Sequence, residues 1–277
     1  MRIVELSSAK PGFWSKWLPG HRAARALSAH RRQRKYQANS GQPTIYVIGD
    51  VHGRLDLLEA LHNAIDRDWA ARGGAGAAVL EIYLGDLVDR GPNSAGVVAR
   101  LLERKSTRPC VFILGNHEAE FLRVLAGTAT PEQITNWLRM GGAATAMSYG
   151  VTDIPRRGEQ DASGFIASLQ ARIPSAHLQF LESSHLFYVA KPYLFVHAGI
   201  RPGLLLVQQS SIDLLSIRDD FLLSDESHDY VVVHGHTPVM DVQFLANRIN
   251  VDTGAFATNR LSCVRLDNDG NAAVLTP

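Results

Sequence analysis

Cysteine is scarce in this chain, and its placement excludes several kinds of site. The 277 residues include two cysteines, Cys110 and Cys263, which lie far apart and show neither metal-site nor redox spacing. Each occurs within an apolar run, so we expect both to be small buried hydrophobic side chains. So little cysteine fits a reducing, cytoplasmic setting.

The chain also lacks long apolar runs. No stretch approaches the roughly 18 apolar residues that cross a bilayer, and the N-terminus has no uninterrupted apolar segment typical of a secretory signal. No phosphate-binding loop of the form GxxxxGKS or GxxxxGKT occurs, so nothing suggests an NTPase. With 45% hydrophobic and 20% charged residues, the composition is that of a globular protein with one large domain or two small ones.

Acidic residues are nearly missing from the N-terminal segment. Residues 1–42 hold nine of the 28 Lys and Arg residues but only one of the 27 Asp and Glu residues. We therefore predict a basic N-terminal extension over 1–42, which would suit an anionic surface or nucleic acid. One main domain is expected over 43–277.

Short apolar runs alternate with helical patterns from Thr44 onward, which indicates an α/β fold. Helices are expected at Leu55–Ala70, Ser94–Glu103 and Glu118–Leu125. A mostly helical insertion is expected over about 127–184, beside the site, where it would shape substrate access. Because the later strands are not all separated by helices, part of the sheet system should be antiparallel or mixed. Strands are expected at Thr44–Ile48, Val79–Leu84, Cys110–Leu114, Tyr193–Val196, Tyr230–Val233, Ile249–Val251 and Leu261–Leu266.

Polar residues follow five of these strands at the point where each strand ends. Ligands of open α/β sheets bind at the carboxyl ends of the strands, because the loops there converge on a crevice. Repetition at five ends is poorly explained as a set of unrelated turns. The residues concerned are Asp50 and His52; Asp86, Asp89 and Arg90; Asn116, His117 and Glu118; His197; and His234 and His236.

The residue types indicate metal chemistry. Imidazole nitrogens mixed with carboxylate and amide oxygens, without thiolates, suit divalent Mn, Fe, Zn or Mg. Six such ligands are too many for one tetrahedral site but suffice for two ions that share a carboxylate. Two neighbouring ions make a hydroxide available near neutral pH and stabilise an in-line displacement. The six are Asp50, His52, Asp86, Asn116, His197 and His236.

The motifs "GDVHGR", "GDLVDRG", "GNHE", "HAG" and "GHTP", in this order, resemble those of the calcineurin-like metallophosphoesterases. The resemblance is to the PPP-type serine/threonine phosphatases and to their relatives that hydrolyse diadenosine tetraphosphate symmetrically. It covers about residues 43–266 and leaves the basic extension outside. It implies two mixed β-sheets sandwiched between helices, an αββα sandwich, with the helical insertion added.

The resemblance also implies how the ligands are shared between two metal ions. Asp50 and His52 would bind the first ion, and Asp86 would bridge both. The second site would be completed by Asn116, His197 and His236. The family motif places the last ligand immediately before a threonine, which selects His236 over His234. His234 is then expected either to support the ligands from behind or to pack in the core.

Four further residues resemble the family's catalytic groups. His117 would protonate the leaving oxygen as a general acid, and Asp89 would orient its ring. Arg90 and Arg218 would bind the phosphoryl oxygens, since a guanidinium matches them in bidentate fashion. Arg54 has no assigned role, because several family members carry an uncharged residue there.

The sequence therefore predicts a metal-dependent phosphoesterase that uses in-line attack by a dimetal-bound hydroxide. Phosphoserine or phosphothreonine in proteins is the expected substrate class, with a phosphorylated small molecule as an alternative. Mn is the expected metal, with Fe, Zn or Mg as alternatives. Symmetrical hydrolysis of diadenosine tetraphosphate is the alternative activity. An inactive scaffold that binds partners through its basic extension would lack a ligand or the acid, and none is missing here.

Overall fold

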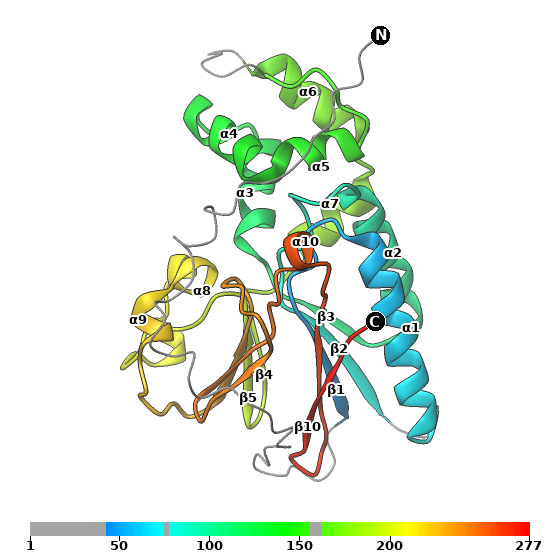
Figure 1. Cartoon of the computed structure of the whole chain (residues 1–277). Coiled ribbons are helices and arrows are strands. Elements are labelled where there is room, and N and C mark those ends of the chain that lie inside the picture. Colours follow the sequence, from blue (N-terminus) through cyan, green and yellow to red (C-terminus); the bar gives the residue numbers. More distant parts are fainter. Residues whose placement is uncertain (1–42, 75–77, 156–161) are drawn as a thin grey trace. The chain divides into compact units, whose positions relative to one another are not determined.

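Two five-stranded sheets form the centre of the fold (Figure 1). The computed structural model describes residues 43–74, 78–155 and 162–277. The predicted basic extension lies outside these residues. In the described part, no helix has the length and apolar character that spanning a membrane requires.

The first sheet has the strand order β10-β9-β1-β2-β3. Strands β1, β2 and β3 are parallel, whereas β9 and β10 add antiparallel strands at one edge. Two helices connect the parallel strands, α1 after β1 and α2 after β2. The bounds are β1 Thr44–Ile48, α1 Leu55–Ala71, β2 Val79–Tyr83, α2 Ser94–Thr107, β3 Cys110–Phe112, β9 Cys263–Leu266 and β10 Ala272–Leu275.

The second sheet has the order β4-β5-β6-β8-β7 and is also mixed. Its central strands β5, β6 and β8 are parallel, and its two edge strands are antiparallel to their neighbours. The bounds are β4 Phe187–Ala190, β5 Tyr193–Val196, β6 Val231–His234, β7 Gln243–Phe244 and β8 Arg248–Asn250.

Alternation along β1 explains the layering. Successive side chains of a strand point to opposite faces. Ile45 and Val47 pack against Phe195 and Val233 of the second sheet, whereas Tyr46 and Ile48 pack toward the helices on the other face. This gives each face of the first sheet its own core.

Helices cover the outer face of each sheet, as Figure 1 shows for α1 and α2 and for the yellow α8 and α9. The region of the predicted insertion is helical in its described part and packs on α2 and α3. The bounds are α3 Asn116–Leu125, α4 Pro131–Trp137, a π-helical turn Leu138–Gly142, α5 Ala143–Ser148, α6 Ser163–Arg172, α7 Ser175–Glu182, α8 Ser211–Ser216, α9 Asp219–Leu222 and α10 Ala255–Thr258.

The predicted fold class is confirmed, and the errors lie in short or edge elements. The strands β4, β7 and β10 were not expected, because short edge strands carry little hydrophobic periodicity. Strand β6 begins one residue later than predicted, at Val231. Thr130 caps α4: its hydroxyl accepts the backbone N–H of Gln133 at 3.3 Å.

A buried ion-pair network ties α1 and α2 to β2 and leads to a stability prediction. Arg104 donates to both oxygens of the fully buried Glu81 at 2.6–3.1 Å and to Asp66 at 2.7–2.9 Å. Arg104→Met leaves the buried Glu81 carboxylate with the Tyr83 hydroxyl at 2.8 Å and with Arg108 at 3.7 Å. We expect the free energy of unfolding, measured by urea denaturation, to fall by about 3–5 kcal/mol.

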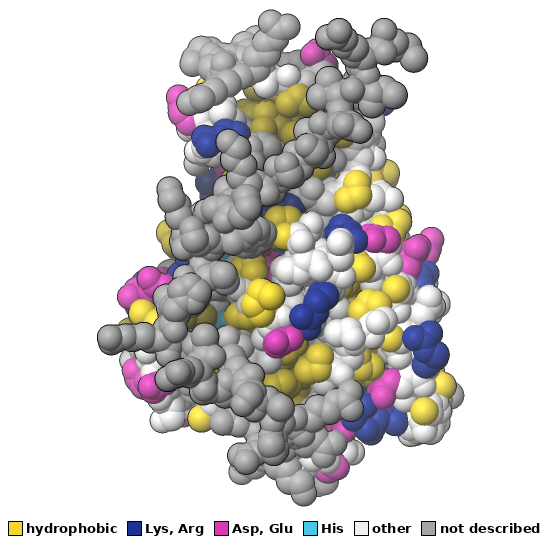
Figure 2. All heavy atoms as spheres, viewed as in Figure 1, with side chains coloured by type: hydrophobic (Ala, Val, Ile, Leu, Met, Phe, Trp, Pro, Cys, Tyr) yellow, Lys and Arg dark blue, Asp and Glu magenta, His cyan; other side chains and the backbone are white. Residues whose placement is uncertain are grey.

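The matched control is Arg100→Met on the same helix. Arg100 pairs with the exposed Glu103 at 3.2 Å, and exposed pairs contribute about 0–1 kcal/mol. On the face of the molecule shown in Figure 2, basic side chains (dark blue) and acidic side chains (magenta) lie interspersed at the surface. Equal losses for the two variants would contradict the assignment of Arg104 as a structural residue.

Candidate metal centre

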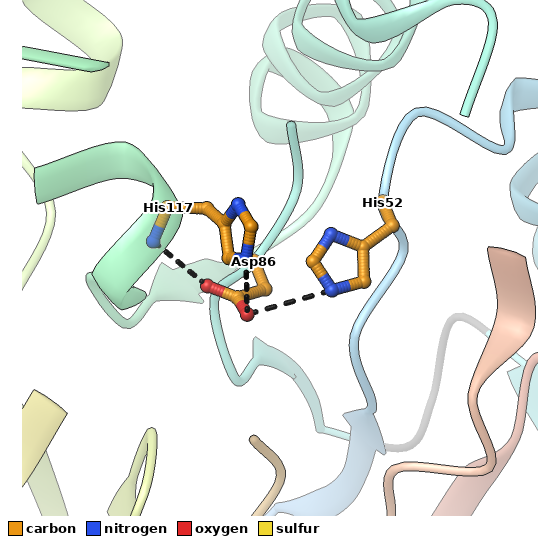
Figure 3. A group of neighbouring side chains, drawn as sticks. All are labelled: His52, Asp86 and His117. Carbon is orange, nitrogen blue, oxygen red and sulfur yellow. Dashed lines mark hydrogen bonds and ion pairs between the residues drawn. The ribbon is translucent and has the colours of Figure 1, made fainter. Parts of the chain in front are cut away.

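Asp86 lies at the centre of the polar residues that follow the strands. Its Oδ2 is 3.5 Å from His52 Nε2, and its Oδ1 is 3.4 Å from His197 Nε2. The backbone N–H of His117 donates to Oδ1 at 3.1 Å, as Figure 3 shows. Burial raises the pKa of Asp86, but the surrounding histidines, His197 first, lower it more, so that its pKa lies below the ordinary value.

Two groups of potential ligand atoms share this carboxylate. In each group the atoms lie within 4.8 Å of one another, and all of the residues are buried: His52, Asp86 and His117 in one, and Asp86, His197 and His236 in the other. The structure thus brings the predicted bridging residue to the junction of two sites.

The predicted ligand Asn116 lies next to the group formed by Asp86, His197 and His236. Its Oδ1 lies 3.0 Å from His197 Nε2, which is in turn 3.1 Å from His236 Nδ1. Three predicted ligand atoms from different strand loops therefore meet at hydrogen-bond distance. The expected clustering of these loops at one edge is observed.

Backbone carbonyls fix two of the histidine rings. His52 Nδ1 lies 2.9 Å from the carbonyl of Val88, and His197 Nδ1 lies 2.8 Å from that of Leu84. A carbonyl only accepts, so each Nδ1 carries the proton and each Nε2 is left with its lone pair toward Asp86. This is how metal-binding histidines are usually oriented.

Two of the predicted metal ligands each have a buried polar atom without a hydrogen-bond partner among the described residues: Asp50 Oδ1 and His236 Nε2. Asp50 Oδ2 accepts the backbone N–H of His236 at 3.0 Å. Burial and the nearby Asp252 and Asp86 raise the pKa of Asp50 well above its ordinary value. A divalent cation would satisfy the orphaned atoms and offset the repulsion between these carboxylates, so the donor set fits metal ions.

The pKa values separate one histidine from the other three. Burial lowers the pKa of His52, and Arg90 lowers it further. Burial also lowers the pKa of His197, although Asp86 opposes this shift, and burial together with His197 lowers that of His236 to about 2. These rings are neutral, as metal ligands must be. Burial also opposes protonation of His117, but Asp86 and Asp89 outweigh it and raise its pKa above the ordinary value. Such divergence is typical of a ligand and an acid placed side by side.

Asp89 and Arg90 surround the His117 ring. Asp89 Oδ2 accepts from His117 Nδ1 at 2.7 Å. Arg90 donates to His117 Nε2 at 2.9 Å and to His52 Nε2 at 3.0 Å, and its guanidinium lies 4.6 Å from the centre of the Phe256 ring. The guanidinium is therefore held at the junction of the predicted acid and the first metal group.

The remaining candidates occupy different positions. Arg218 immediately precedes α9, and burial together with the nearby Arg90 lowers its pKa below the ordinary value. Arg54 is engaged elsewhere, because it pairs with Asp56 at 2.6 Å and donates to the carbonyl of Ala255. His234 is fully buried with its ring edge against Phe221, in agreement with packing.

Strained backbone is concentrated at this site. Among the described residues, six non-glycine residues have positive φ, and all but Asn259 are site residues: His52, Asp86, Asp89, Arg90 and His236. Each such residue costs roughly 1–3 kcal/mol, which persists only where the surroundings fix the conformation. Glycine is required alongside them: a Cβ on Gly115 would lie 2.2 Å from the backbone nitrogen of Asp86.

Several residues that hold the site were not predicted as functional. The buried Glu118 accepts four backbone N–H groups, those of Asp86, Leu87, Val88 and Gly115, at 2.8–3.0 Å. The final letter of the "GNHE" motif was the only sequence signal for this role. Trp137, Thr145 and Asp252 gave no signal, because nothing in a local pattern shows which distant loop a side chain will reach.

Comparison with known proteins agrees with this geometry. The family model described as calcineurin-like phosphoesterase matches residues 43–269. A relative from Anoxybacillus flavithermus, named bis(5'-nucleosyl)-tetraphosphatase PrpE [asymmetrical], is 23% identical over 79% of this chain and 89% of its own. The protein of the same name from Bacillus thuringiensis is 24% identical over the same shares.

Solved structures show the same fold. A crystal structure provisionally assigned as a diadenosine tetraphosphatase has a TM-score of 0.58 and 20% identity, covering 86% of this chain and 95% of that one. The cold-active protein tyrosine phosphatase of a psychrophilic Shewanella has a TM-score of 0.52 and 18% identity, covering 85% and 81%. Since the family model spans most of the chain and the motif residues converge on one buried centre, this protein belongs to the calcineurin-like phosphoesterase family, whose members use a dimetal centre.

Proposed function

We propose that this protein hydrolyses phosphomonoesters of alcohols, with phosphoserine and phosphothreonine in proteins as the substrate class. The observation that carries the proposal is the 2.7 Å contact between His117 Nδ1 and Asp89 Oδ2. An alkoxide is a poor leaving group and must be protonated as it departs. General acid catalysis of this kind commonly contributes about 10²–10⁴-fold.

The arrangement of His117 supports its role as this acid. Asp89 holds the proton on Nδ1, so the second proton of the imidazolium, on Nε2, is the one available to a leaving oxygen. Arg90 donates to Nε2 when that nitrogen is unprotonated, which is the state that follows proton transfer. Asp89 therefore orients the His117 ring before proton transfer, and Arg90 can donate to its Nε2 after the proton has left.

Two arginines would bind the phosphoryl group. Arg90 presents its guanidinium between His52 and His117 and is flanked by Phe256. Arg218, which immediately precedes α9, is the second candidate. Planar guanidinium groups fit phosphoryl oxygens, and their charge is complementary to that of the transition state.

Asp50, His52 and Asp86 would hold one divalent ion, and Asp86, Asn116, His197 and His236 the other. Bound ions at this position supply Lewis-acid charge for the phosphoryl oxygens and a nucleophile near neutral pH. The nitrogen and oxygen donors suit Mn²⁺, which we propose as the first ion to test. The chain's own residues then orient the ester and move the proton.

Hydrolysis of dinucleoside tetraphosphates is the second candidate, supported by the names of the relatives. Those names specify asymmetrical cleavage, which yields a mononucleotide and a nucleoside triphosphate, whereas the motif resemblance suggested symmetrical cleavage to two diphosphates. A phosphate leaving group needs less protonation than an alkoxide. The well-held acid therefore favours the phosphomonoester substrate.

A direct comparison of substrates tests the proposal. Metal-stripped protein reconstituted with Mn²⁺ would be assayed on a phosphothreonine peptide and on diadenosine tetraphosphate, with Asn116→Ala as the blank. We expect the larger kcat/KM on the peptide. A larger kcat/KM on the nucleotide would overturn the proposal, and its products, AMP with ATP or two ADP, would identify the mode of cleavage.

A further inference from the structure

The helical insertion reaches the carboxylate that orients the predicted acid. Trp137 ends α4, and its indole Nε1–H donates to Asp89 Oδ2 at 3.0 Å. Thr145 lies in α5, and its hydroxyl donates to Asp89 Oδ1 at 2.6 Å. Together with His117 Nδ1–H, these bonds place a donor on each carboxylate oxygen.

The donors form a consistent network. The carboxylate can only accept, so the Thr145 hydroxyl proton goes to Asp89 Oδ1, and Ser94 must donate to Thr145 Oγ1 across their 2.9 Å contact. The backbone N–H of Asp89 is shared between the same two hydroxyl oxygens, at 2.9 Å to Thr145 and 3.0 Å to Ser94. Asp89 has positive φ and is fully buried, so these contacts hold both its backbone and its side chain.

Packing fixes the direction of the Trp137 indole. The ring is 2% exposed and stacks on Phe121 of α3, with centroids 5.4 Å apart and planes 12° from parallel. A Cβ added to Gly142 would lie 2.2 Å from this ring, so the chain of the insertion closes directly on it. The insertion also contacts Arg90, the residue after Asp89, because the Arg90 backbone N–H donates to the Gly141 carbonyl at 3.2 Å.

We propose that Trp137 and Thr145 are positioning residues that hold Asp89 so that His117 keeps its proton on Nδ1 and its Nε2 directed to the leaving group. This inference rests on the proposed function of His117 as the general acid. The insertion then has a second role besides substrate access: it completes the acid. Neither residue touches a predicted metal ligand in this network.

Two conservative substitutions test the inference. Thr145→Val removes the hydroxyl and keeps the shape, and Trp137→Phe removes the N–H donor and keeps an aromatic ring on Phe121. The matched control is Thr135→Val, because the Thr135 hydroxyl bonds only within its own helix, to the Pro131 carbonyl at 2.8 Å. Metal content and melting temperature would be measured for all variants.

The decisive readout is the dependence on the leaving group. Phenyl phosphate and p-nitrophenyl phosphate share the phosphoryl group but differ in how much the leaving oxygen needs a proton. We expect Thr145→Val and Trp137→Phe to lower kcat on phenyl phosphate about tenfold more than on p-nitrophenyl phosphate, since small misplacements of catalytic groups cost up to about 100-fold. Equal losses on both substrates, or no loss, would overturn the inference.

A spectroscopic measurement separates failure of this inference from failure of the proposed function. If wild-type protein hydrolyses neither phosphate ester, the proposed function fails, and nitrogen-15 NMR of labelled histidine in Mg²⁺ buffer still decides the inference. At a pH where the ring is neutral, His117 should be a single Nδ1–H tautomer in wild type and in Thr135→Val, and a mixture in the other two variants. The same tautomer in all four proteins would refute the positioning role.

Discussion

Replacing His117 with alanine is expected to lower kcat on a phosphoserine peptide by about 10²–10⁴-fold, the usual contribution of a general acid. The loss on p-nitrophenyl phosphate should be far smaller, because nitrophenolate leaves without a proton. The physical basis is the held ring: Asp89 accepts from its Nδ1 at 2.7 Å while its Nε2 lies beside Arg90. Steady-state kinetics on the two substrates measure the difference.

The pH profile gives a second check on the same residue. Because Asp86 and Asp89 raise the pKa of His117 above 6.5 despite its burial, the acid form should persist to higher pH than for an ordinary histidine. The wild-type rate on the peptide should fall as pH rises through that pKa, and His117→Ala should lack this descending limb. The control is His177→Ala, whose ring contacts Tyr149 in the insertion. An equal loss of rate on both substrates would remove the assignment of His117 as the acid.

Asp86→Asn should abolish both metal retention and activity. Asp86 is the residue common to the two ligand groups, within 3.5 Å of His52 and His197. Loss of residues that merely support a ligand weakens metal affinity about 10–100-fold, so loss of a shared carboxylate should cost at least about 100-fold. Asparagine tolerates the positive φ of this position, so the backbone should survive the change.

Metal content by mass spectrometry and phosphate release together measure this effect. The control is Asp68→Asn, because Asp68 accepts from Tyr46 and Arg265 away from the centre and should keep its metal. If Asp86→Asn retained both ions and full activity, Asp86 would not be the bridge.

The sequence was informative about this site because each motif is local. A buried strand followed at once by Asp50 and His52, or by Asn116 and His117, can be recognised from neighbouring residues alone. Parallel strands then bring the loop ends within each sheet to one edge. The packing of the two sheets brings these edges together, so that His197 lies beside Asp86 and Asn116. The same reasoning could not predict β4, β7 or β10, because these short edge strands carry little hydrophobic periodicity, although each pairs with a strand that is its neighbour in the sequence.

Sequence alone determined the α/β class, the identity of the metal-ligand candidates and the placement of His117 beside them. Its motifs predicted the αββα architecture through their resemblance to a known family. Only the tertiary structure decided which residues hold them: Glu118 accepts from the backbone of the Asp86 loop, and Trp137 and Thr145 donate to Asp89. It also decided that Arg54 pairs with Asp56. The reason is physical. Hydrophobic period and turn chemistry act between neighbours along the chain, whereas the partner of a buried polar group is set by which segments pack together in space.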